Sequence, residues 1–300
     1  MKVFYWIENA EGELFYHASM QLARLYGGLG IVGYTASVPL DSCIADGKEL
    51  RFVEKPELKD EDYDVLFVIG KNLRREKVLQ ECQSLGIDTS NVVFDFEACI
   101  PGFSLGRANR LHRCHTSILA INSWGRKMYE RFQLPMRSPF MNSAMTTPDW
   151  LEFLEAPQEH LAKELVFCET LGTADGREFP VFTMGEGGLK VYMLYETDEE
   201  KIRQQWAQGV QTVSWQDLLV MTYTDSQEVL ERFDRLPYRK KICFTSFESQ
   251  LSSAFYLPPV EDEEGEDMPL WASVDELTKS SKPYYDLWDM LLYGRKTLVN

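Results

Sequence analysis

The chain has 300 residues, of which 44% are hydrophobic, and a formal net charge of −16 at pH 7. This composition is that of a globular protein and excludes a disordered or collagen-like chain. So large an acidic excess would repel phosphate backbones and anionic lipids, so neither nucleic acid nor a membrane surface is an expected partner. The six cysteines are scattered, and no segment resembles a membrane helix or a signal peptide, which predicts a cytoplasmic protein.

Strand and helix patterns alternate over the first hundred residues. Buried apolar strands joined by helices predict a parallel sheet, and so a Rossmann-like three-layer N-terminal unit of the α/β class. The segment after the first strand, residues 8–12, carries two glutamates and one glycine, so it lacks a phosphate-binding glycine fingerprint. Strands are predicted at 3–7, 31–34, 64–69 and 92–94, and helices at 14–25 and 78–85.

A Pro/Gly-containing break at residues 101–106 predicts a linker to a second α/β unit. Six acidic residues fall within 261–267 and predict a loop before an aromatic-rich helical tail over 274–292. The predicted domains are 1–106, 107–257 and 258–300. In the second unit, strands are predicted at 118–121, 190–194, 218–222 and 241–245, and helices at 125–132, 198–208 and 226–236.

Three N-terminal segments, at residues 33–37, 62–76 and 85–87, occur in an order that resembles the N-terminal domains of bacterial sugar acyltransferases. The resemblance covers about residues 30–100. It implies that Gly70 and Asn72, at the turn after the third strand, contact a nucleotide-sugar. A helix N-cap is the alternative explanation of Asn72.

In the second half, the segments 122–129, 134–140, 148–154 and 233–245, together with Trp206 and Trp215, occur in a characteristic order. Over residues 115–247 this order resembles domain-of-unknown-function family 1919, whose members are often described as exopolysaccharide biosynthesis proteins. Members usually carry Asn-Asn-Cys-Trp-Gly-Gly where this chain has residues 121–126, and often a His where it has Leu194. The arginines that usually precede Trp215 are also absent.

The same resemblance places a site near the strand ends of the second unit. Residues 122–125 form a strand-to-helix turn, whose backbone amides can hold an anion. Core packing is the alternative explanation of Trp124, and a helix cap that of Ser123. The candidate catalytic residues are Asp225, as acid or base, Asp149 and Ser123. The candidate ligand-binding residues are Asn122, Trp124, Gly125, Asn142 and, as phosphate partners, Arg126 and Arg137.

His112 and His115 flank Cys114, but no second ligand pair follows at zinc-site spacing, and in an extended segment the two imidazoles face opposite sides. No metal is therefore predicted, and without a glycine fingerprint no cofactor is expected. Two hypotheses remain open. The first is a transferase that acts on an activated sugar or glycan intermediate of bacterial exopolysaccharide or envelope-glycan biosynthesis. The second is a non-catalytic protein with the same fold, which either binds a sugar nucleotide or sugar phosphate or has a regulatory role.

Overall fold

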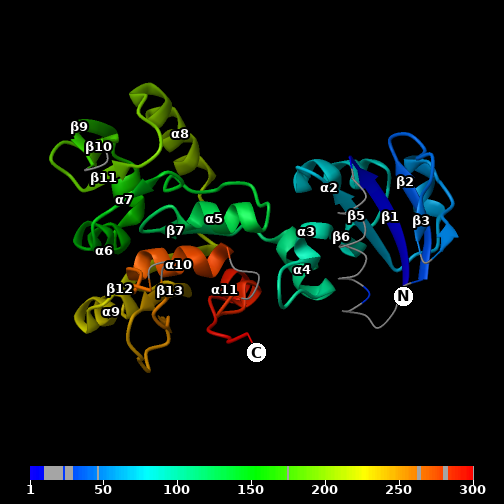
Figure 1. Cartoon of the computed structure of the whole chain (residues 1–300). Coiled ribbons are helices and arrows are strands. Elements are labelled where there is room, and N and C mark those ends of the chain that lie inside the picture. The colour runs from blue at the N-terminus through cyan, green and yellow to red at the C-terminus, as the bar shows by residue number, and fades with distance from the viewer. Residues whose placement is uncertain are drawn as a thin grey trace. The chain divides into compact units, whose positions relative to one another are not determined.

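The structure, a computed structural model, describes residues 1–9, 23, 30–45, 47–173, 176–261, 265–279 and 283–299. The chain divides into two compact units, Met1–Cys114 with Phe132–Pro135, and His115–Arg131 with Met136–Asn300 (Figure 1). Most of the helix predicted over 14–25 lies outside the described residues. The three-part division at 106 and 257 stays a proposal.

A four-stranded parallel sheet with the strand order β2-β1-β5-β6 forms the first unit. The prediction of an α/β fold is confirmed. The elements of this unit are β1 (Lys2–Glu8), β2 (Gly30–Ala36), β3 (Ile44–Ala45), β4 (Lys48–Glu49), the 3-10 helix η1 (Lys55–Asp60), β5 (Val65–Gly70), α2 (Arg75–Ser84), the 3-10 helix η2 (Thr89–Asn91), β6 (Val92–Phe94), α3 (Asp95–Ala98) and α4 (Leu105–Arg113).

Both faces of this sheet are buried, which explains its uninterrupted apolar strands. In β1 every residue from Val3 to Ile7 is buried. Phe4 and Trp6 pack into one cluster with Leu66 and Val68 of β5. The alternate residues of β1 are also buried, so neither face of the central strands contacts solvent.

A charged cluster lies in the interior of the first unit, where β5 and β6 end. Glu97 of α3 is fully buried and forms an ion pair with Arg75, the first residue of α2, which is only 3% exposed. His112 Nε2 lies 3.0 Å from the same carboxylate. The Arg75 guanidinium lies 5.7 and 5.3 Å from the ring centroids of Phe94 and Phe96. Burial alone raises the pKa of Glu97, but Arg75 and His112 outweigh it and hold that pKa below its usual range.

We expect Glu97→Gln to lower the free energy of unfolding by about 3–5 kcal/mol, because Arg75 would stay buried without its counter-charge. Glu155→Gln makes the same chemical change in the exposed Glu155–Arg232 pair, where we expect a loss below about 1 kcal/mol. Urea denaturation measures the free energy of unfolding of both variants. If Glu97→Gln lost no more of this free energy than Glu155→Gln, the structural role of the cluster would be contradicted.

The second unit contains a parallel and an antiparallel sheet. The strand orders are β14-β13-β12-β7, all parallel, and β8-β11-β10-β9, all antiparallel. The elements are β7 (Ser117–Ala120), α5 (Trp124–Arg131), β8 (Ser143–Ala144), α6 (Thr147–Glu155), α7 (Pro157–Leu161), β9 (Leu165–Gly172), β10 (Glu178–Met184), β11 (Lys190–Met193), α8 (Glu199–Thr212), β12 (Leu218–Thr224), α9 (Gln227–Asp234), β13 (Lys240–Thr245), β14 (Ala254–Tyr256), α10 (Leu270–Lys279) and α11 (Leu287–Tyr293).

Two features of this unit differ from the prediction. Only β11 of the antiparallel sheet was expected. The helical tail predicted over 274–292 contains two helices rather than one, because residues 283–286 are not helical and separate α10 from α11. Pro283 has no amide hydrogen for a helix ladder, and Tyr285 instead forms a bridge with Leu298.

The last turn of α7 contains a partly buried histidine, His160. Its Nδ1 is buried and has no hydrogen-bond partner among the described residues, and the ring centroid lies 6.2 Å from that of Phe153. Burial, assisted by the charge of Lys163, lowers the pKa of His160 below its ordinary value of 6.5. The folded state therefore favours the neutral imidazole.

Because the folded-state pKa of His160 lies below the unfolded-state value, its stabilising contribution is complete above pH 6.5 and is lost as the pH falls through the folded-state pKa. We expect His160→Gln to remove this part of the acid-induced loss of stability, and Lys163→Met to reduce it. Urea denaturation between about pH 7.5 and 5 provides the comparison. Identical pH profiles for wild type and His160→Gln would contradict this account.

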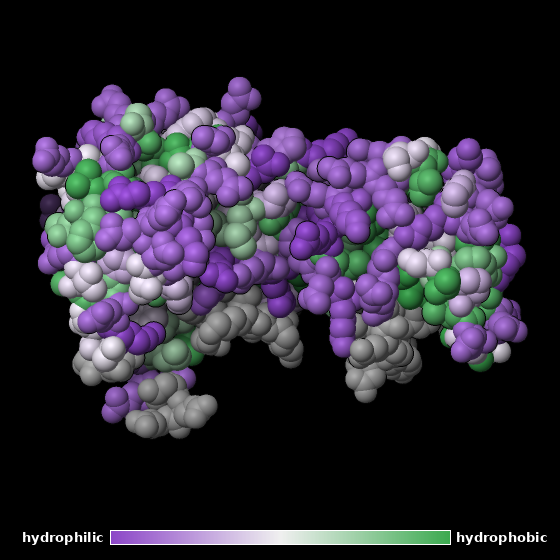
Figure 2. All heavy atoms as spheres, turned by 90° about the horizontal axis from the view of Figure 1, so that it is seen from above, coloured by the Kyte–Doolittle hydropathy of each residue, from purple (hydrophilic) through white to green (hydrophobic). Residues whose placement is uncertain are grey.

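Hydrophilic residues cover most of the face shown in Figure 2, where hydrophobic residues form separate patches. The large exposed apolar side chains come from distant parts of the sequence, for example Val38, Tyr195 and Trp271. Among the described residues, no helix has the length and apolar character needed to cross a membrane.

Candidate functional site

The turn between β7 and α5 is held by the side chain of Asn122. Its Oδ1 accepts a hydrogen bond of 3.1 Å from the backbone N of Trp124, at the start of α5. Ser123, the other candidate for this capping role, is buried. The amide side chain predicted to bind a ligand therefore satisfies a helix-terminal N–H group.

Two further residues of the predicted turn belong to the helix–sheet packing. Trp124 is fully buried, and its ring makes edge-on contacts with Tyr223 and Phe244 at centroid distances of 5.3 and 5.6 Å. A Cβ added at Gly125 would lie 3.3 Å from the side chain and carbonyl oxygen of Ile118. Gly125 thus lets α5 lie close to β7.

The two candidate aspartates lie in segments that are connected to the same edge of the parallel sheet, the edge at which β7 and β12 end. Asp225 follows β12, the neighbour of β7, and is exposed. Asp149 lies in the first turn of α6, where its backbone N donates to Thr146 Oγ1 at 3.3 Å. The chain entering α6 is tied to the β7 turn by a hydrogen bond of 2.9 Å from Met145 N to the carbonyl of Ile121. Their catalytic roles stay a prediction.

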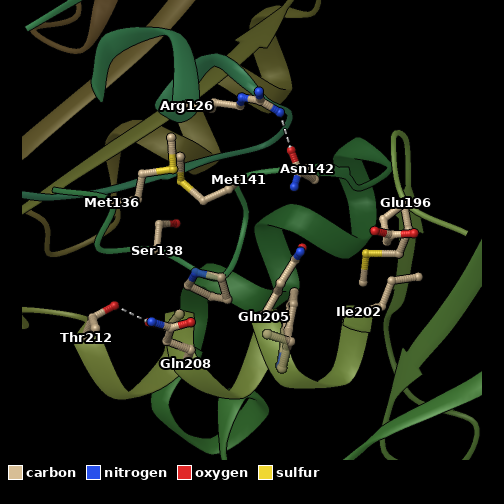
Figure 3. A pocket seen from close by; sticks show the side chains of 14 residues that line it. Arg126, Met136, Ser138, Met141, Asn142, Glu196, Ile202, Gln205, Gln208 and Thr212 are labelled. Carbon is tan, nitrogen blue, oxygen red and sulfur yellow. Dashed lines mark hydrogen bonds between the residues drawn. The ribbon is translucent and has the colours of Figure 1, made fainter. Parts of the chain in front are cut away.

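A pocket of about 410 Å³ lies between the start of α5, the segment 136–142 and α8 (Figure 3). It brings together two of the predicted ligand-binding residues, Arg126 and Asn142. In Figure 3 this pair lies at one end of the pocket, and Gln208 and Thr212 lie at the other. The lining residues are Arg126, Met136, Ser138, Pro139, Met141, Asn142, Met193, Glu196, Ile202, Gln205, Trp206, Gln208, Gly209 and Thr212.

The guanidinium of Arg126 is oriented by two side chains. Nη1 donates to Asn142 Oδ1 at 2.7 Å, and Nε donates to Glu130 at 2.7 Å one helical turn away. The Asn142 backbone is fixed as well, because its carbonyl accepts from Leu194 N at 2.8 Å. Within the described part of the chain, Nη2 of Arg126 has no hydrogen-bond partner.

Glu196 is the sole carboxylate among the described residues that line this pocket. Its Oε1 accepts from the backbone N of Thr197 and of Asp198, each at 3.0 Å. Lys201 Nζ lies 4.0 Å from Oε2. The carboxylate thus orders the chain that enters α8.

Close packing of α8 against the segment 136–142 forms the wall of the pocket. A Cβ added at Gly209 would lie 2.6 Å from Pro139 Cα and 2.7 Å from the Ser138 carbonyl oxygen. The pocket residues of α8 are not among the residues that the sequence pattern predicts for a site. A glycine within a helical pattern is a signal that could have indicated this close contact.

The N-terminal candidates lie in the first unit. A side chain at Gly70 would overlap the backbone of Glu8 on the neighbouring strand, so its glycine is required by strand packing. Asn72 has a φ of +54°, and the N-cap of α2 is Arg74, so the N-cap interpretation of Asn72 is wrong. Asn72 does line a pocket of about 200 Å³ with residues such as Glu8 and Lys77. Its ligand-binding role stays a prediction.

The other polar candidates are not in the larger pocket. Arg137 interacts with Tyr129, whose pKa is raised by burial against the opposing effect of Arg137. The segment 112–115 is not fully extended as expected, because α4 continues to Arg113 and directs His112 to Glu97. In the described ranges, no group of three or more metal-ligating side chains is arranged to hold an ion.

The chain belongs to a family of undetermined function. The sequence profile described as "Domain of unknown function (DUF1919)" matches residues 97–293, well over half of the chain and more than the predicted 115–247. An uncharacterized protein of Haemophilus influenzae is 24% identical over 182 residues, which cover 58% of this chain and 81% of the relative. The predicted family is confirmed, and neither similarity names a reaction.

We expect Asn122→Ala to lower the free energy of unfolding by about 0.5–2 kcal/mol, because the Trp124 amide loses its acceptor at the start of α5. Asn122→Asp keeps an accepting oxygen and should retain most of the stability. Chemical denaturation of both variants measures the difference. Equal losses in the two variants would show that the turn does not depend on this hydrogen bond.

Proposed function

We propose that this protein binds a sugar nucleotide or sugar phosphate of bacterial envelope-glycan biosynthesis in the pocket between α5 and α8. The observation that carries the proposal is the Arg126 guanidinium, held by Asn142 at one end of the pocket. A guanidinium binds phosphate oxygens through charge-assisted hydrogen bonds. In a chain with a net charge of −16, a fixed cation at a pocket is the group that would attract such an anion.

The remainder of the pocket matches the sugar part of such a ligand. Gln205, Gln208 and Thr212 of α8 add amide and hydroxyl groups, which can donate to and accept from sugar hydroxyls. Methionine and isoleucine side chains supply the apolar lining that binding pockets usually have, and the volume is in the usual range for small ligands. The resemblance to proteins described as exopolysaccharide biosynthesis proteins supports the envelope-glycan assignment. None of the six cysteines, all of which lie in described ranges, forms a disulfide, which supports a cytoplasmic location.

The geometry favours binding over catalysis. General acid–base chemistry needs a carboxylate or imidazole within reach of the substrate. Oε1 of Glu196 is occupied by two backbone amides, and Asp149 and Asp225 do not line this pocket. The transferase hypothesis is supported by Asp225, an exposed carboxylate on the same sheet edge as Asn122.

Titration calorimetry with UDP-glucose and glucose 1-phosphate tests the proposal. We expect both to bind the wild-type protein, and Arg126→Met to weaken binding about tenfold or more because a charge-assisted hydrogen bond is lost. Arg232→Met is the matched control, since Arg232 is also a half-exposed arginine paired with a glutamate. It should bind as the wild type does.

If neither compound bound the wild-type protein, or if the two arginine variants lost affinity equally, the proposal would be overturned. Turnover of UDP-glucose that Asp225→Asn abolishes without loss of binding would favour the transferase hypothesis over a binding protein.

A further inference from the structure

An exposed aromatic ring stands beside the pocket. Tyr195 follows β11 and is 62% exposed. Its chain neighbours are both tied to the pocket: Leu194 N donates to the Asn142 carbonyl at 2.8 Å, and Glu196 is a lining residue. Tyr195 is therefore held at the end of the pocket where Arg126 and Asn142 lie.

The ring and the pocket cation are neighbours. The Arg126 guanidinium carbon lies 6.0 Å from the centroid of the Tyr195 ring, and Nη1 of the same guanidinium donates to Asn142. An aromatic surface and a phosphate-binding group thus occur side by side, joined through one arginine. The ring contributes little to the core of the protein, because most of its surface faces solvent.

This pairing matches the two parts of a nucleotide. A planar base gains free energy by stacking on an aromatic side chain, and the adjacent phosphates gain it from a guanidinium. A sugar 1-phosphate has a phosphate for the guanidinium but no base to stack on the aromatic ring. A stacking surface of this kind would distinguish the two ligand classes that the proposed function leaves open.

We infer that Tyr195 and Arg126 form a nucleoside diphosphate subsite, in which the base stacks on Tyr195 and the diphosphate binds Arg126. The sugar then extends into the pocket toward Gln205 and Gln208. This inference rests on the proposed function and narrows it to a nucleoside diphosphate sugar. Tyr195 is accordingly a specificity-determining residue.

The test measures the dissociation constants of UDP and glucose 1-phosphate by titration calorimetry in four proteins: wild type, Tyr195→Ala, Tyr195→Phe and Arg126→Met. We expect UDP to bind the wild type more tightly than glucose 1-phosphate does. Tyr195→Ala should reduce this preference about tenfold, because the stacking surface is lost, whereas Tyr195→Phe should keep it. Arg126→Met should weaken both ligands.

The outcomes separate the two proposals. If both ligands bind through Arg126 but Tyr195→Ala leaves the preference for UDP unchanged, the nucleoside subsite is overturned and the proposed function stands. If neither ligand binds the wild type, both are overturned. Because Tyr195 is exposed, its substitution is compatible with folding, which circular dichroism of each variant checks.

Discussion

The close approach of α8 to the segment 136–142 is the constraint on which the larger pocket depends. At Gly209 the helix backbone lies directly against Ser138 and Pro139, with no room for a Cβ. This contact brings the amide side chains of α8 opposite Arg126, which is more than seventy residues earlier in the chain. A larger residue at position 209 would move the helix away, and the pocket would lose one of its walls before any polar group was changed.

The parallel sheets could be predicted because a strand that is buried on both faces appears in the sequence as a continuous run of apolar residues. Residues 3–7 in β1 and 65–69 in β5 are all apolar, and a short continuous run of this kind is consistent with a fully buried strand. The strand-to-helix turn at Asn122 could be predicted for the same reason, since it follows the buried strand β7. Asn142 has no periodic or motif signal of its own in the sequence, and the structure brings it to Arg126.

The antiparallel sheet and the complete pocket could not be predicted. β9 mixes Phe167 and Leu171 with polar neighbours, and most of its side chains are partly or fully exposed, so its alternation does not define a core face. β8 has only two residues, too few for a periodic signal. The pocket combines three distant segments, and its assembly depends on tertiary packing rather than on local spacing. The N-cap expected at Asn72 is wrong because this left-handed residue lies two positions before Arg74, the residue that occupies the N-cap of α2.

The buried pair of Arg75 and Glu97 has a consequence for how the boundaries of this family are understood. The family profile begins at residue 97, so it includes Glu97 and His112 but omits their partner Arg75 and the sheet around them. A chain shortened to the matched range would keep the Glu97 carboxylate, which is fully buried in the whole chain, and would lose its ion-pair partner Arg75. The family profile thus begins inside the first compact unit rather than at its boundary.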